Sequence, residues 1–213
     1  MRFVKLLLLL VIVGLGNSSK TDGFSISLID DATMVRMEGR SFKKDCSAKR
    51  EDLRLLTILH YDHRGVLRKG ELVCNRAIAK DLIEIFEELY KAKYPIEKVR
   101  LIDEYEGDDE RSMQDNNTSC FNFRKVSGSI HLSKHATGMA VDINTLYNPC
   151  VSNVNGKQKV EPANAAPWAK NRTKARNKMV ITRDDLCVKL FKQHGFKWGG
   201  DWKSKKDYQH FEK

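Results

Sequence analysis

The sequence contains no Cys-x-x-Cys pair, so a zinc site built from cysteine pairs is not expected. Its long apolar run, Leu6–Leu15, is shorter than the roughly 20 residues that a membrane-spanning helix needs. No cysteine directly follows that run, so nothing marks a lipid anchor. The lysines and arginines form no basic stripe with interleaved aromatic residues, which argues against nucleic acid as a partner. With these classes of site and partner disfavoured, the function is sought in individual polar residues.

The N-terminal segment has the features of a secretory signal. Arg2 and Lys5 give a basic start before the apolar run. We expect residues 1–18 to be a signal peptide, residues 19–48 an exported N-terminal arm, and residues 49–213 one domain with a single core. The protein should therefore be exported, to the periplasm or the extracellular space, without stable membrane insertion after cleavage. Cleavage would lower the net charge from +10 to +8, which favours approach to anionic polymers.

An exported protein lies in an oxidising compartment, where cysteines can pair. The odd number of cysteines leaves at least one thiol unpaired or paired between chains. A bridge between Cys120 and Cys150 would brace the loops on either side of the central motif described next, although connectivity cannot be read from sequence. Cys187 is expected to be a buried apolar side chain.

Two stretches carry residues suited to a metal centre, Ser-Lys-His-Ala-Thr-Gly-Met-Ala-Val-Asp at 133–142 and Asp-Tyr-Gln-His at 207–210. Zinc in a hydrolytic site usually takes three His or carboxylate ligands and leaves its fourth position to water. His135, Asp142 and His210 supply that number and that chemistry for one zinc ion. A His-x6-Asp pair alone is common by chance, so the surrounding residues decide its meaning.

Gly138 favours a loop that carries His135 and turns at the glycine into a strand that carries Asp142. Asp207 lies three residues before His210, so a tight turn would bring its carboxylate near a water on the metal. Asp207 is therefore the expected general base.

Other residues near these stretches offer alternatives. His131 lies four residues before His135, but no Glu follows it as in the helical zinc proteases. Ser133 would be a nucleophile only if His135 were its base; if His135 binds metal, Ser133 should hydrogen-bond nearby groups. The His-Tyr-Asp-His run at 60–63 could suggest a second metal site, but a turn explains it better.

The pattern Ser-x-His-x-x-Gly-x-Ala-x-Asp is followed by Gly-Phe-x-Trp-Gly-Gly-Asp-Trp at 195–202 and by Asp-x-x-His-Phe at 207–211. Together with Asn-Thr-Ser-x-Phe-Asn-x-Arg at 117–124, it resembles the zinc peptidases that cut bacterial cell-wall peptides. These are the VanY-type D-alanyl-D-alanine carboxypeptidases and the L-alanyl-D-glutamate endopeptidases of phage lysins. The resemblance runs from about residue 53 to residue 213.

This resemblance implies that His135, Asp142 and His210 are zinc ligands and that Asp207 handles the proton. It also implies that Arg124 binds a substrate carboxylate or the oxyanion that develops on the scissile carbonyl. A structural salt bridge is the alternative for Arg124.

The implied function is zinc-dependent hydrolysis of peptidoglycan stem peptides, by a carboxypeptidase or an L-alanyl-D-glutamate endopeptidase, in a protein that we expect to be a monomer. The rival is a non-catalytic, zinc-containing cell-wall-binding protein of the same fold, of the kind that the similar hedgehog signalling domain suggests. Asp207 favours the enzyme, because a non-catalytic relative has no need of a carboxylate there.

The expected fold class is α+β, with a small, mainly antiparallel sheet that carries the ligands and helices packed on one face. Alternating apolar residues predict a hairpin with strands at 53–61 and 66–74. Helical spacing then predicts a helix from Asn75, as its cap, to about residue 93, before Pro95.

Four further segments complete the prediction. A strand is expected over 99–105 and a polar loop over 106–119. Residues 147–178 should be a long loop around the rim of the site. A short helix should start at a capping-box-like Thr182 with Asp185 and end at Gly195.

Overall fold

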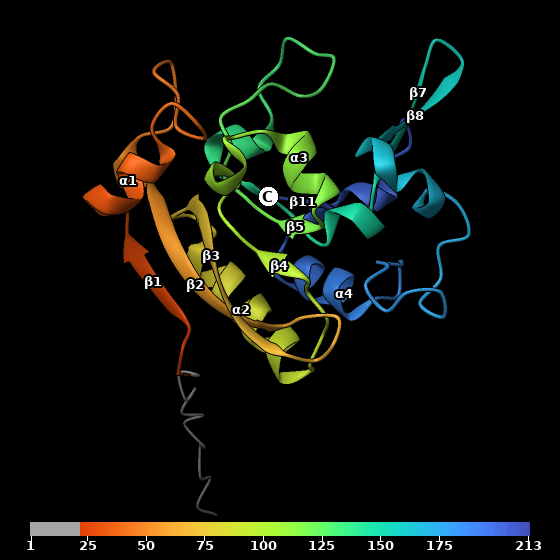
Figure 1. Ribbon diagram of the computed structural model, residues 1–213, viewed down its shortest axis with the longest axis horizontal. Coiled ribbons are helices and arrows are strands. Elements are labelled where there is room, and N and C mark those ends of the chain that lie inside the picture. The colour runs from red at the N-terminus through yellow and green to blue at the C-terminus, as the bar shows by residue number, and fades with distance from the viewer. Residues whose placement is uncertain (1–21) are drawn as a thin grey trace, which may run out of the picture.

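The computed structural model describes residues 22–213, so the expected signal peptide lies outside the described part of the chain. The fold is α+β, as predicted, with several small and mostly antiparallel sheets and helices packed against them (Figure 1). None of the helices in residues 22–213 has the length and apolar character needed to cross a bilayer.

The first sheet holds the predicted hairpin. Strands β2 (Leu53–Tyr61) and β3 (Leu67–Asn75) pair antiparallel from Leu53–Asn75 to Tyr61–Leu67, and β1 (Ser25–Leu28) adds to the free edge of β2. The turn is fixed by Asp62, whose carboxylate accepts hydrogen bonds from the amides of Arg64 and Val66. Part of the expected N-terminal arm is therefore a strand of this sheet, and α1 (Asp31–Met37) follows it.

Helix α2 (Ala79–Lys91) packs on the same sheet, against β2. Its apolar face is fully buried, as the helical spacing predicts: Leu82, Ile85, Phe86 and Leu89. The predicted cap is wrong, because Asn75 is the last residue of β3 and its side chain accepts from the amide of Ala77. The helix consequently starts after Ile78.

The segment after α2 differs from the prediction. Only β4 (Lys98–Val99) is a strand, paired in parallel with β5 (Asn117–Thr118), and Ile102–Tyr105 is a short 3₁₀ helix. The expected loop contains α3 (Asp109–Gln114), which Asp108 caps by accepting from the amide of Arg111. The strand is short because the amide of Arg100 bonds to the Asn117 side chain instead of continuing a ladder.

The sheet that carries the ligands is made of β6 (Ala140–Asp142), β11 (His210–Glu212) and β9 (Lys197–Trp198), in that order. Val141 and Phe211 are paired across β6 and β11, and both side chains are completely buried. Phe211 stacks on Phe191 of α4 (Leu186–Gln193), with ring centroids 4.2 Å apart. This packing ties the ligand sheet to the main core.

Helix α4 confirms the predicted second helix, but its cap is Asp185, which accepts from the amide of Cys187, and not Thr182. Gly195 follows the helix with a φ of +81°, as expected for a residue that ends a helix. Leu186, the first residue of the helix, is 39% exposed and does not belong to its buried face.

The expected loop at 147–178 contains a hairpin of β7 (Cys150–Val154) and β8 (Lys157–Glu161). Asn155 and Gly156 turn it with φ of +51° and +77°, which is the Asn-Gly signal of a tight hairpin. Strand β10 (Lys206–Asp207) pairs with the other edge of β7.

All five cysteines are free thiols, so the Cys120–Cys150 bridge does not form. The Cys120 thiol instead donates to the carbonyl of Gly138 at 3.5 Å. Cys187 is completely buried, as predicted.

Candidate metal centre

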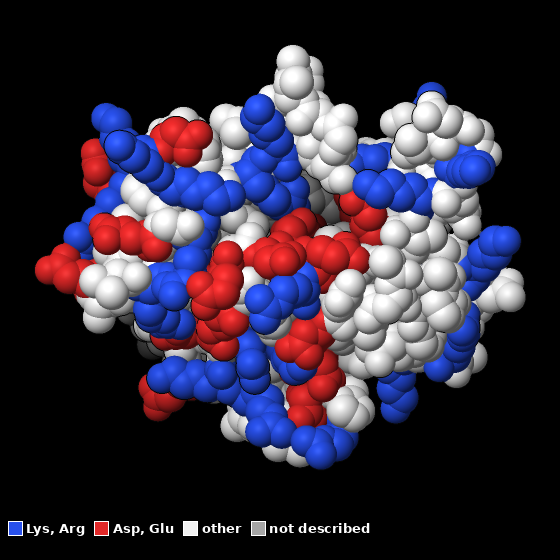
Figure 2. All heavy atoms as spheres, turned by 45° about the horizontal axis from the view of Figure 1, so that its top comes forward, with Lys and Arg blue, Asp and Glu red and all other residues white. Residues whose placement is uncertain are grey.

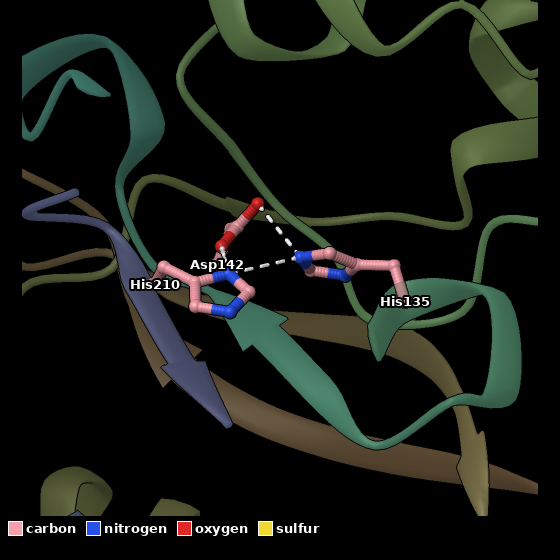
Figure 3. A group of neighbouring side chains, drawn as sticks. All are labelled: His135, Asp142 and His210. Atoms are coloured by element: carbon pink, nitrogen blue, oxygen red, sulfur yellow. Dashed lines mark hydrogen bonds and ion pairs between the residues drawn. The ribbon is translucent and has the colours of Figure 1, made fainter. Parts of the chain in front are cut away.

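The structure brings His135, Asp142 and His210 together, with their side chains pointing toward one another (Figure 3). The His135 Nε2 atom lies 3.1 Å from Asp142 Oδ2 and 3.2 Å from His210 Nδ1. His210 Nδ1 lies 3.0 Å from Asp142 Oδ1. All three residues are buried, with exposed fractions of 3%, 5% and 7%.

Strand pairing positions two of the three. Asp142 ends β6 and His210 begins β11, and they are directly opposite partners in the antiparallel register. Side chains of such partners lie on the same face of a sheet. Backbone hydrogen bonding therefore sets their separation before any ion is bound.

A tight turn positions the third residue of the group, His135. His135 lies on a short 3₁₀ helix, Lys134–Thr137, which Ser133 caps by accepting from the amide of His135. Gly138 then takes a φ of +68°, and a Cβ built there would lie 2.6 Å from the amide nitrogen of Asn75. Only glycine fits this turn against β3, and it leads from His135 into β6 as the sequence predicts.

In each imidazole, the ring nitrogen that does not contact Asp142, called the outer nitrogen, has a hydrogen-bond partner of its own. His135 Nδ1 lies 2.6 Å from the carbonyl oxygen of Cys120, and His210 Nε2 lies 3.2 Å from Glu212 Oε2. A carbonyl and a carboxylate only accept, so these nitrogens are assigned as the donors. The inner nitrogens, His135 Nε2 and His210 Nδ1, are then left with lone pairs that face Asp142.

The charges in this group are strongly coupled. Burial would raise the pKa of Asp142, but the charges of His135 and His210 and their hydrogen bonds hold it well below its usual range. Burial would lower the pKa of His210, yet hydrogen bonds to Asp142 and Glu212 raise it to about 10. The group therefore favours positive charge at its centre, which a proton or a metal cation can provide.

These residues fit a small divalent cation. Zinc bonds of about 2.0–2.1 Å in a tetrahedral arrangement place ligand atoms about 3.3 Å apart, and the observed separations are 3.0–3.2 Å. Two imidazole nitrogens and a carboxylate are also the donors that zinc takes in hydrolytic sites. The group could therefore hold one metal ion with a position left open.

The triad lies in the wall of a cavity of about 430 Å³. Five acidic side chains line it: Asp109, Asp142, Glu161, Asp207 and Glu212. Figure 2 shows acidic side chains beside a hollow on the face drawn there. The loop over residues 125–132 and the β7–β8 hairpin project from the same side of the molecule (Figure 1). The cavity is therefore bordered by segments far apart in sequence.

Asp207 lines this cavity, as the sequence predicts for a residue beside the metal. Its Oδ1 atom is buried and has no hydrogen-bond partner within residues 22–213. Its Oδ2 atom lies 3.5 Å from the ammonium of Lys205. A buried carboxylate oxygen without a partner is well placed to accept a proton from a water or a substrate in the cavity.

Arg124 also lines the cavity, and its guanidinium lies 2.8 Å from Asp109 Oδ2. The salt bridge given above as the alternative for Arg124 is therefore present, in a residue that still faces the site. Desolvation raises the pKa of Asp109, and the charge of Arg124 opposes this rise. Asp109 was missed in the sequence because its pairing depends on α3, which the sequence analysis assigned to a loop.

Glu212 was also missed, although its spacing of two residues from His210 within a strand places both on one face. The other histidines do not join the site. His131 is exposed, and His60 is buried with its Nδ1 atom 2.7 Å from the carbonyl oxygen of Ile96. Asp62 fixes the hairpin turn, so the 60–63 run is explained without a metal.

A second group of potential ligands, Asp81, Glu84 and His194, lies on the surface between α2 and α4. The ammonium of Lys213 is 2.7 Å from Asp81 Oδ2 and already supplies a positive charge there. The buried triad therefore remains the stronger candidate.

The fold and the site define an α+β protein with a candidate mononuclear metal centre in an open cavity. Residues 127–213 match the model of a family described as D-alanyl-D-alanine carboxypeptidase, and this part of the chain is a domain of that family. The match confirms the predicted resemblance over residues 127–213, which include the triad and Asp207, whereas Arg124 and Asp109 precede the matched part. No solved structure matches the chain.

Proposed function

We propose that the protein is a zinc-dependent peptidase that hydrolyses peptidoglycan stem peptides containing D-residues. One observation carries the proposal: a buried His-Asp-His group shares a cavity with Asp207, a carboxylate that has an unpartnered oxygen. The family match supplies the peptide chemistry.

His135, Asp142 and His210 would hold the zinc ion through His135 Nε2, His210 Nδ1 and the Asp142 carboxylate. Zinc in this position would supply a water of lowered pKa and polarise the scissile carbonyl. Asp207 accepts the proton of the attacking water on its unpartnered Oδ1 and returns it to the leaving amine. Arg124, held by Asp109, directs its remaining N–H groups toward charge that develops on the substrate.

We also propose that the protein acts after export, as a monomer. The basic charge would favour its approach to the anionic polymers of the cell wall. The non-catalytic, cell-wall-binding alternative predicts no turnover and no requirement for Asp207.

The test is incubation of the purified protein with peptidoglycan fragments, with and without a chelator, followed by mass analysis of the products. The parent should release peptide products only in the absence of chelator. His135→Ala should lose both zinc and cleavage. Asp207→Asn should keep zinc and lose about 10²- to 10⁴-fold in rate, the usual contribution of a general base.

Asp184→Asn is the matched control, because Asp184 is an exposed aspartate outside the cavity, and it should behave as the parent. Equal activity of Asp207→Asn and the parent would refute the assigned base. A zinc-loaded parent that releases nothing from any fragment would refute the peptidase.

A further inference from the structure

The cavity contains a lysine to which no role has yet been given. Lys205 precedes β10, and in an extended chain residues 205 and 207 point to one face while residue 206 points to the other. Lys206 indeed turns away and donates to the carbonyls of Gly200 and Trp202. Lys205 and Asp207 both line the cavity, whereas Lys203 is exposed and outside it.

The ammonium of Lys205 makes only long contacts with its neighbours. Its contact with Asp207 Oδ2 is 3.5 Å long, whereas charge-assisted hydrogen bonds are usually about 2.7–2.9 Å. It also lies over the face of the Trp202 ring, 5.0 Å from the ring centre. By contrast, the guanidinium of Arg124 is paired with Asp109 at 2.8 Å. Lys205 is therefore the cation beside Asp207 with hydrogen bonds left for a ligand.

Two segments that line the cavity are linked to each other by polar side chains. Ser127, Lys159 and Glu161 form a clasp between the 125–132 loop and β8. The Ser127 hydroxyl donates to Glu161 Oε1 at 2.7 Å, and the Lys159 ammonium lies 3.0 Å from the hydroxyl and 2.9 Å from the carboxylate. The clasp joins two segments that are far apart in sequence, and Ser127 and Glu161 both line the cavity.

The strand register fixes how far the clasp lies from the proposed base. Asp207 is opposite Cys150 on β7, and Cys150 is opposite Glu161 on β8, so the three residues form one row across the sheet. Two strand spacings amount to about 10 Å, a length that an extended chain of about three residues would fill. A substrate that extends from Asp207 toward the clasp would therefore have room for only a short leaving group.

We propose that Lys205 is a specificity-determining residue that binds the C-terminal carboxylate of the peptide, so that the enzyme removes residues from the chain end. This rests on the proposed function and assigns it to the carboxypeptidase type. The same chemistry could recognise a side-chain carboxylate of the stem peptide, and the experiment separates the two sources.

The experiment compares three stem peptides that end in D-alanyl-D-alanine: the free acid, its C-terminal amide, and the free acid with its D-glutamate carboxylate amidated. For the parent, terminal amidation should lower kcat/KM by about 10- to 100-fold, the usual effect of losing a hydrogen bond to a charged group. Amidation of D-glutamate should have little effect.

Lys205→Met should lower kcat/KM for the free acid by a similar factor, mainly through KM, and leave the C-terminal amide unchanged. Lys205→Arg should restore part of the loss, and Lys203→Met is the matched control and should resemble the parent. The zinc content of every variant is measured, because a general structural defect would lower it and would reduce turnover of all three peptides alike.

An equal loss on all three peptides would overturn the role of Lys205. A parent that is sensitive to D-glutamate amidation but not to terminal amidation would overturn the assignment to the chain end. A parent that cleaves with dependence on Asp207 but does not distinguish acid from amide overturns this inference alone. A zinc-loaded parent that cleaves none of the peptides overturns the proposed function as well.

Discussion

Gly138→Ala is the most direct test of how the fold builds the site. Gly138 has a φ of +68°, and an added Cβ would lie 2.6 Å from the amide nitrogen of Asn75 and 3.1 Å from the carbonyl carbon of Cys74. Left-handed backbone costs a non-glycine residue about 1–2 kcal/mol, and a clash with a packed neighbour adds about 1–3 kcal/mol. Because β3 is paired along its length with β2, the turn must move rather than the strand.

We therefore expect Gly138→Ala to lower the free energy of unfolding by about 2–5 kcal/mol. The turn joins His135 to β6, so its displacement should also weaken zinc binding by about 10-fold or more. Urea unfolding of metal-free protein measures the first effect, and competition with a chromophoric chelator measures the second.

Gly128→Ala is the matched control. Gly128 has nearly the same backbone, with a φ of +71°, but an added Cβ meets nothing within 4 Å. Its substitution should therefore cost only the backbone term of about 1–2 kcal/mol and leave zinc affinity unchanged. Equal destabilisation by the two substitutions would show that contact with β3 is not what requires glycine at position 138.

Three further outcomes follow from the same structure. Glu212→Ala should weaken zinc binding by about 10- to 100-fold, because His210 loses the partner that orients its ring, and a chelator competition assay will measure this. Chelation should lower the melting temperature, and titration with zinc should restore it in proportion to the logarithm of free zinc. Hydrogen bonds from the amides of Val66 and Arg64 lower the pKa of Asp62 to about 2, against about 3.9 in an unfolded chain. A carboxyl group whose pKa is lower in the folded state stabilises the fold at pH values above its unfolded pKa, and this stabilisation is lost as the pH falls. The difference in free energy of unfolding between the parent and Asp62→Asn, measured by urea unfolding, should therefore shrink between about pH 4 and pH 2.

The regular parts of the fold could be predicted from the sequence because their signals are local. Strand β2 alternates buried and half-buried residues from Leu56 to Tyr61, and α2 places Leu82, Ile85, Phe86 and Leu89 at helical spacing. Such periodicity persists whatever packs against the element.

The remaining elements are too short to show a period. Strands β4, β5, β9 and β10 have two residues each, and tertiary contacts alone define them. The β7–β8 hairpin is a different case, because Asn155 and Gly156 form a sequence signal for a tight turn, and this signal contradicts the loop predicted over residues 147–178.

In the candidate site, too, some residues could be predicted from local sequence signals and others depend on tertiary contacts. Motif spacing and family resemblance identified the triad and Asp207, which the fold brings to one cavity. The carbonyl of Cys120 and the carboxylate of Asp109 could not be found in this way, because each reaches its partner only through packing of distant segments. Whether the triad binds zinc and Asp207 acts as a base stays a prediction.

The pairing of β6 with β11 has a consequence for how the protein would respond to changing metal supply. Asp142 and His210 are held opposite each other by backbone hydrogen bonds, and the buried Val141–Phe211 pair beside them rests on the main core. An emptied centre would therefore keep its shape and refill without the chain having to fold again. Activity could rise and fall reversibly with the available ion, unlike that of small zinc domains, which unfold when the metal is withdrawn.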